Sequence, residues 1–121
     1  MMTKLYSTIT ELGGECDMMK EENMLILFHE DVPQELKEIA VVHNNKNLQN
    51  KVESGDYLVL NEEKFEILFV GSKANETLEE MGHATIQFNG QSTSDLPGTI
   101  CVEAKTIPAL EAAQEIKIIR E

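Results

Sequence analysis

The residue of this sequence with the most suggestive chemical setting is His43, which stands between the apolar run 39–42 and the polar run 44–47. A residue at such a junction is held by the core on one side and faces solvent on the other. Residues 39–52 contain no acid, although acids are 22 of the 121 residues. A phosphorylated imidazole carries up to two negative charges, which a nearby carboxylate would destabilise. The setting therefore makes His43 a candidate acceptor of a phosphoryl group, provided that a donor can reach its ring.

A second histidine, His83, has a similar setting. Residues 81–94 are also free of acids, and His83 follows Gly82, where the pattern predicts the end of a helix. The negative end of a helix favours a protonated or hydrogen-bond-donating imidazole. We expect His83 to contact phosphoryl oxygens if the fold brings it close to His43.

Nothing in the sequence predicts a metal or cofactor site. The histidines are far apart, Cys16 and Cys101 have no zinc spacing, and no nucleotide-binding or hydrolase motif is present. The remaining histidine, His29, precedes two acids, and we interpret it as a charge-paired surface residue.

Charge and hydropathy exclude several classes of protein. The net charge of −12 repels nucleic acid and anionic membranes and attracts a partner with a basic face. The longest apolar run, residues 24–28, is far below the ~20 residues of a membrane helix. Residues 1–10 have neither a basic start nor an apolar stretch, so we expect a cytoplasmic protein with reduced thiols, without membrane insertion.

Period-two alternation predicts a mostly β fold, a small barrel or sandwich of short, mainly antiparallel strands in one domain, residues 1–121. Parallel pairing would need long crossover helices, which the pattern lacks. Two short helices are predicted, one capped by Asp31 and one that starts at Asn75 and stops at Gly82. The strands are expected within 5–10, 24–28, 57–60, 65–70, 85–88, 100–102 and 116–118, with a turn at 61–63.

These segments together resemble the glucitol/sorbitol-specific IIA component of the bacterial phosphoenolpyruvate-dependent sugar phosphotransferase system. The resemblance covers nearly the whole chain, and its most specific part is the segment 75–90. The matching pieces are Tyr6-Ser7-Thr8-Ile9-Thr10, Met24-Leu25-Ile26-Leu27-Phe28, Pro33, Leu36, Val41-Val42-His43, Gly55-Asp56, Val70-Gly71-Ser72, Asn75, Leu78, Met81-Gly82-His83-Ala84-Thr85-Ile86-Gln87-Phe88-Asn89-Gly90 and Leu96-Pro97-Gly98-Thr99-Ile100.

The resemblance implies that His43 is the phosphoacceptor. Phospho-HPr would be the donor, and a cysteine of the IIB part of the sorbitol transporter, which works with the membrane component IIC, would be the acceptor. Some relatives carry a second histidine two residues after the acceptor, followed by glycine, and here those positions hold Asn45 and Lys46. Asn44, Asn45, His83 and backbone N–H groups are then the candidate donors to the phosphoryl oxygens. No metal is required, because a phosphohistidine donor is already activated.

The sequence is also compatible with two other functions and with a homodimer. The chain could be a non-catalytic regulatory or binding domain of the same fold. The missing second histidine is compatible with this alternative. It could also bind a small ligand or a metal through His43 and His83. A homodimer is compatible with the sequence, since Phe69 and Ile119 are apolar residues out of phase with their strands.

Overall fold

Eight strands and three short helices make up the computed structural model, which describes residues 1–121. The strands are β1 (Met2–Leu12), β2 (Met24–His29), β3 (Val41–His43), β4 (Tyr57–Leu60), β5 (Glu63–Val70), β6 (Ala84–Gln87), β7 (Thr99–Val102) and β8 (Glu115–Arg120). The helices are α1 (Cys16–Glu21), α2 (Gln34–Lys37) and α3 (Ala74–Met81).

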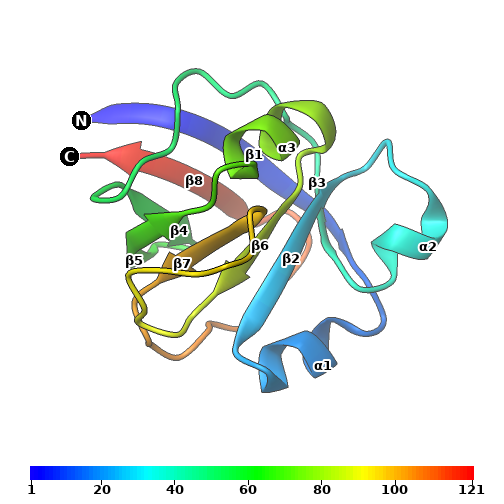
Figure 1. Ribbon diagram of the computed structural model, residues 1–121. Coiled ribbons are helices and arrows are strands. Elements are labelled where there is room, and N and C mark those ends of the chain that lie inside the picture. The colour runs from blue at the N-terminus through cyan, green and yellow to red at the C-terminus, as the bar shows by residue number, and fades with distance from the viewer.

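The strands close into one barrel in the order β1-β3-β2-β6-β7-β5-β4-β8 (Figure 1). Six of the eight neighbouring pairs are antiparallel, and β2–β3 and β6–β7 are parallel. The predicted mostly β fold with mainly antiparallel strands is confirmed, and it is a barrel. The expectation that parallel pairing needs long helices is wrong here, because residues 30–40, with only the short helix α2, return the chain from β2 to β3.

The predicted hairpin of β4 and β5 is tighter than the sequence suggested. Leu60 pairs with Glu63, so the turn consists of Asn61 and Glu62 alone. Both have positive φ, 46° and 74°. This left-handed backbone at two successive residues matches the twist of the flanking strands.

The core fills the barrel, and a smaller apolar cluster lies outside it. Phe28, Ala40 and Val42 form this outer cluster, which packs against Leu36 of α2. Strands β2 and β3 are therefore covered on both faces, which explains why every residue of β3 is buried. The inner core includes Leu5, Ile9, Leu25, Leu27, Val41, Leu58, Leu60, Phe65, Ile67, Ile86, Ile100, Val102, Ile116 and Ile118.

The helices agree only partly with the sequence prediction. Asp31, predicted to cap the first helix, makes no cap bond, and α2 starts after Pro33 instead. Helix α1 was not predicted, because six residues are too few to show a helical period. Its first residue, Cys16, is buried, and the thiol donates to the backbone carbonyl of Ala40 at 3.0 Å.

Helix α3 ends as predicted at Gly82, whose φ of 60° satisfies the left-handed position after a helix. Asn75, predicted to begin the helix, lies one residue inside it and does not cap it. Its side chain instead bonds the backbone of Val52, accepting from the N–H at 2.7 Å and donating to the carbonyl at 3.0 Å. These two bonds fasten the start of α3 to the connection between β3 and β4.

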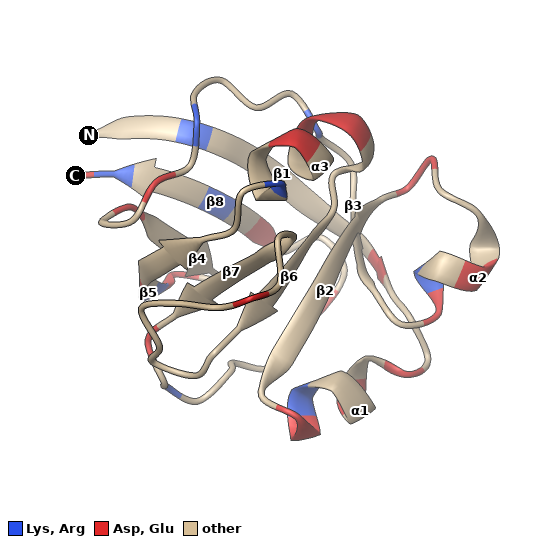
Figure 2. Ribbon diagram, in the orientation of Figure 1, with Lys and Arg blue, Asp and Glu red and all other residues tan.

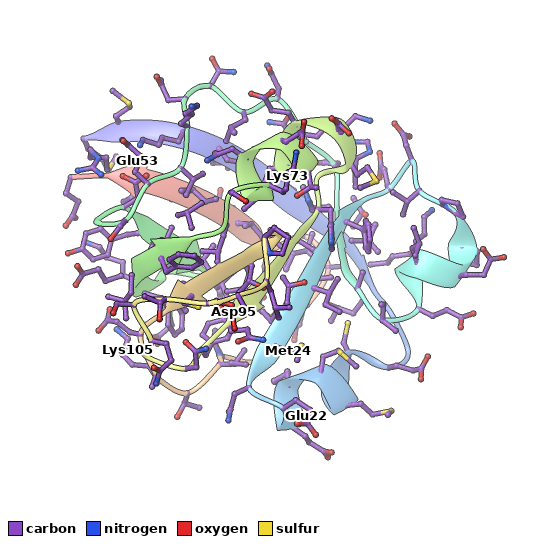
Figure 3. All side chains as sticks on the ribbon, in the orientation of Figure 1. Glu22, Met24, Glu53, Lys73, Asp95 and Lys105 are labelled. Carbon is purple, nitrogen blue, oxygen red and sulfur yellow. The ribbon has the colours of Figure 1, made fainter.

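A buried ion cluster joins the two terminal strands to the start of β4. Lys4 Nζ lies 2.8 Å from Asp56 Oδ2, and Arg120 Nε lies 2.7 Å from Asp56 Oδ1. Asp56 Oδ2 also accepts the backbone N–H of Glu53 at 2.7 Å. The exposed carboxylate of Glu53, labelled in Figure 3 beside the ends of β1 and β8, lies 3.3 Å from Lys4 Nζ. Asp56 and Lys4 are both buried, so their charges compensate each other inside the protein.

The surfaces of the three helices carry much of the excess of acids. Figure 2 shows acidic residues on α1, α2 and α3. Helix α3 contributes Glu76, Glu79 and Glu80, and residues 30–38 around α2 contribute four more acids. None of the helices has the length and apolar character needed to cross a membrane.

Candidate phosphoryl-acceptor site

Three polar side chains, Ser7, His29 and His43, face the barrel interior where β2 and β3 end. His43 pairs with Ile9 of β1 and with His29 of β2, and paired residues share a face of the sheet. Ser7 lies two residues before Ile9 and therefore on the same face. Helix α3 leads into Gly82, whose carbonyl bonds His43, and its position next to β1 and β3 can be followed in Figure 1.

The ring of His43 is completely buried, contrary to the expectation that one side of it faces solvent, and both of its nitrogens are hydrogen-bonded. Nδ1 lies 2.8 Å from Ser7 Oγ, and Nε2 lies 2.8 Å from the carbonyl oxygen of Gly82. A carbonyl can only accept, so Nε2 carries the proton of the neutral ring and Nδ1 accepts from the Ser7 hydroxyl. A donor cannot reach the ring in this conformation, and access to Nε2 requires that the backbone at Gly82 moves away.

Glycine at position 82 is what permits this close cover. A Cβ atom there would lie 2.9 Å from Cε1 and Nε2 of His43 and from Cβ of His29. Only two residues, Gly82 and His83, separate the end of α3 from the start of β6. The cover over Nε2 is thus a short connection rather than a strand of the barrel.

The hydroxyl of Ser7 is the centre of a small polar network. Oγ accepts the backbone N–H of Asn45 at 2.9 Å and lies 3.4 Å from Asn44 Oδ1. The side chain of Asn45 is used within the chain, donating to the carbonyl of Tyr6 at 2.7 Å and accepting the N–H of Asn47 at 2.9 Å. Of the two asparagines named from the sequence, Asn44 is the exposed one.

His29 is buried, contrary to its interpretation as a surface residue. Its Nδ1 lies 3.3 Å from Asp31 Oδ2 and accepts the backbone N–H of Asp31 at 3.1 Å. The ring stands edge-on to that of His43, with centroids 6.2 Å apart. The parallel register of β2 and β3 places the two histidines together, and this pairing was not expected from the sequence.

His83 lies on the other side of the barrel wall from His43. Its ring stacks on Phe28 of the outer cluster at 4.2 Å, and Nδ1 donates to the carbonyl of Leu27 at 3.1 Å. The structure therefore does not bring the rings of His83 and His43 into contact in this conformation. No group of three or more His, Cys, Asp or Glu side chains gathers in a way that could hold a metal ion.

The acid-free character of residues 39–52 does not extend to their spatial neighbours. Asp31 and Glu30 follow β2 directly, and the N–H of Glu30 donates to the carbonyl of His43 at 2.9 Å. Lys46 Nζ lies 3.9 Å from Asp31 Oδ2 and 3.4 Å from the carbonyl oxygen of Glu80 at the end of α3. Lys46 thus offsets part of the acidic charge near the ends of β2 and α3.

Burial lowers the pKa of His43 below its ordinary value of 6.5, because the charged ring would lose its hydration. The bond to Gly82 acts in the opposite direction and raises the pKa, while the neighbouring His29 lowers it further. The ring of His43 is therefore neutral near pH 7 in the folded protein, which is the form with a lone pair for attack.

The stability of the protein is expected to fall as the pH drops below about 6.5, with His43 as one cause. The unfolded chain takes up a proton at an imidazole pKa near 6.5, whereas the folded chain resists protonation until a lower pH. The loss is at most about 1.4 kcal/mol per pH unit. Urea unfolding at pH 7.5 and 5.5 measures the free energy of unfolding at both values. This free energy should change less between them in His43→Gln than in the original protein, and an equal change in both would contradict the contribution of His43.

Sequence reasoning missed two parts of the site, and both left a signal. Ser7 is a polar residue on the strand face that Leu5 and Ile9 fill with apolar side chains. Gly82 was predicted only as the end of a helix. The signal for its second role is that β6 begins two residues later and pairs with β2, which brings the Gly82 backbone close to the end of β2.

Comparison with known proteins gives matches along most of the chain. A family model described as the PTS system glucitol/sorbitol-specific IIA component matches residues 4–117. The chain is 33% identical over 102 residues to the PTS system glucitol/sorbitol-specific EIIA components of Shigella flexneri and of Escherichia coli (strain K12), covering 84% of this chain and 83% of each relative. It is also similar to the crystal structure of a PTS system IIA component from Enterococcus faecalis V583, with a TM-score of 0.84 and 26% identity over 95% of this chain and 99% of that one.

Proposed function

The chain belongs to the glucitol/sorbitol-specific IIA components of the sugar phosphotransferase system, and from this we propose that His43 accepts a phosphoryl group from phospho-HPr and passes it to the IIB component. Membership in the family carries a role in phosphotransfer during sugar transport. The donor, the acceptor and the residue that carries the phosphate are the parts of the function that we propose.

The observation that carries the assignment to His43 is that the fold orients both nitrogens of this ring. Ser7 and Gly82 hold it from opposite edges, and burial keeps it neutral. The protein contributes to phosphoryl transfer mainly by aligning the nucleophile with the phosphorus atom. An oriented neutral imidazole is therefore well suited to accept the group.

Transfer requires an open state in which the connection of Gly82 and His83 withdraws from Nε2. Docking of the donor would supply the energy for this movement, and the closed state would shield the ring between transfers. The same movement would carry His83 with it, which is why we retain His83 as a candidate contact for the phosphoryl oxygens. Asn44, exposed at the edge of the site, is the second candidate contact.

Incubation with phosphoenolpyruvate, Enzyme I and HPr should add one acid-labile phosphate to the protein, detected by mass measurement. His43→Ala should add none, because the nucleophile is gone. His29→Gln and His83→Gln test the other histidines, and each should still take up one phosphate per chain. Full phosphorylation of His43→Ala would overturn the assignment.

The burial of His43 also favours a second candidate, a regulatory domain of the same family whose phosphorylation is slow and signals sugar supply. Asn45 replaces the second histidine of some relatives, which is compatible with this role. The two functions differ in a strain that lacks its own sorbitol IIA component. Restored sorbitol uptake assigns transport, whereas phosphorylation in vitro without restored uptake assigns regulation.

A further inference from the structure

The hydroxyl of Ser7 has two acceptors within reach and can donate to only one of them at a time. The first is Nδ1 of His43 at 2.8 Å, and the second is Asn44 Oδ1 at 3.4 Å. Oγ is held in place by the N–H of Asn45 at 2.9 Å, and Asn44 Oδ1 by the N–H of Thr8 at 3.2 Å. Rotation of one buried O–H bond therefore changes which of the two acceptors the hydroxyl bonds.

The two hydroxyl orientations correspond to the two neutral forms of the His43 ring. When the hydroxyl points to Nδ1, that nitrogen is bare and Nε2–H donates to the carbonyl of Gly82, as in the structure. When the hydroxyl points to Asn44, Oγ can accept a hydrogen bond from a protonated Nδ1, and Nε2 is the bare nitrogen. The exchange between the two forms requires that solvent, admitted when Gly82 withdraws, takes the proton from Nε2 and returns one to the ring at Nδ1. A bare Nε2 would face the lone pairs of the Gly82 carbonyl, so this second form is stable only after Gly82 has withdrawn.

The surroundings favour Nε2 as the nitrogen that meets a donor. Nδ1 faces Ser7, which lies within β1, is 1% exposed and is fixed by the backbone of Asn45. Nε2 bonds the carbonyl of Gly82, which lies in the two-residue connection between α3 and β6. Opening the Nδ1 side would require breaking the pairing of β1 and β3, whereas opening the Nε2 side moves a two-residue connection.

We propose that Ser7 and Asn44 act as positioning residues that select the reactive nitrogen of His43. Ser7 holds the proton on Nδ1 while Nε2 attacks, and Asn44 accepts the hydroxyl hydrogen of Ser7 in this state. The inference rests on the proposed function of His43 and adds to it the residues that prepare the ring.

The transfer step balances without an added acid or base. The phosphorus–nitrogen bond of a ring-protonated phosphohistidine in the donor breaks, and its electron pair stays on the donor nitrogen. The Nε2 lone pair of His43 forms the new phosphorus–nitrogen bond. The Nδ1 proton stays on the His43 ring, which gains the positive charge that the donor ring loses, and its bond to Ser7 strengthens as this charge develops.

Nitrogen NMR of the full chain labelled with ¹⁵N-histidine can locate each proton directly. The free protein should show a bare Nδ1 and a protonated Nε2 on His43. After phosphorylation by phospho-HPr, phosphorus should be on Nε2 and the proton on Nδ1. Phosphorus on Nδ1 would overturn the proposal while leaving His43 as the acceptor.

Variants of the two residues test their roles with a readout that loss of packing alone would not change. Ser7→Ala should slow phosphorylation about 10- to 100-fold, as expected when a buried donor loses its partner. In the phosphorylated Ser7→Ala protein, Nδ1 should lose its proton at a pH about one unit lower than in the original protein. Ser7→Thr, which keeps the hydroxyl, should restore both quantities.

Asn44→Ala should slow phosphorylation about 5-fold, because the hydroxyl loses its second acceptor, and the exposed Asn47→Ala is the matched control with an unchanged rate. Unchanged rates and an unchanged Nδ1 titration in Ser7→Ala would refute the role of Ser7. Failure of the proposed function looks different, since His43 would then carry no phosphate even in the original protein.

Discussion

Replacing Asp56 with asparagine is expected to lower the free energy of unfolding by about 3–5 kcal/mol. Asp56 is completely buried, and its carboxylate lies within 2.8 Å of the Lys4 ammonium and within 2.7 Å of the Arg120 guanidinium. The substitution keeps the shape of the side chain but leaves the charge of Lys4, which is 2% exposed, without a buried partner. Urea unfolding at pH 7 measures the loss.

Glu53→Gln is the matched control, because this carboxylate also lies 3.3 Å from Lys4 Nζ but is 64% exposed. Solvent screens the exposed pair, so the control should change stability by no more than about 1 kcal/mol. A similar small effect in Asp56→Asn would show that water reaches Lys4, and that the cluster does not hold β1 and β8 to the rest of the barrel.

Gly82→Ala is expected to destabilise the protein by about 2–5 kcal/mol and to uncover the ring of His43. The φ of 60° at Gly82 costs an alanine roughly 1–2 kcal/mol. The added methyl group would also lie 2.9 Å from atoms of His43 and His29, and such overpacking costs about 1–3 kcal/mol more. The backbone must then shift away from Nε2, and water entering the gap should raise the pKa of His43 toward its ordinary value.

Gly90→Ala separates the two causes of this effect. Gly90 also has a positive φ, 68°, but a Cβ there would lie 3.4 Å from the nearest atom, Cβ of Ala104. The control should therefore carry only the backbone cost and leave the NMR titration of His43 unchanged. If the two variants lose equal stability and neither shifts the titration, Gly82 does not cover the histidine as the structure indicates.

Most of the strands could be predicted from the alternation of apolar and polar residues. The errors concern features that this alternation does not report. Period two shows which residues share a strand face, such as Ser7 with Leu5 and Ile9, but it did not reveal that Ser7 meets His43. It cannot show which strands become neighbours or in which direction they pair. The parallel pair of β2 and β3 was missed for this reason, and with it the contact of His29 and His43.

The sequence by itself determined the family, the β architecture and the position of His43 at the end of an apolar run, since these depend on residue types and local periodicity. Only the tertiary structure decided what surrounds the imidazole. Its partners Ser7 and Gly82 lie 36 and 39 residues away along the chain. Such contacts depend on how the barrel closes and on the register of its strands, and both follow from packing over the whole chain rather than from any local pattern.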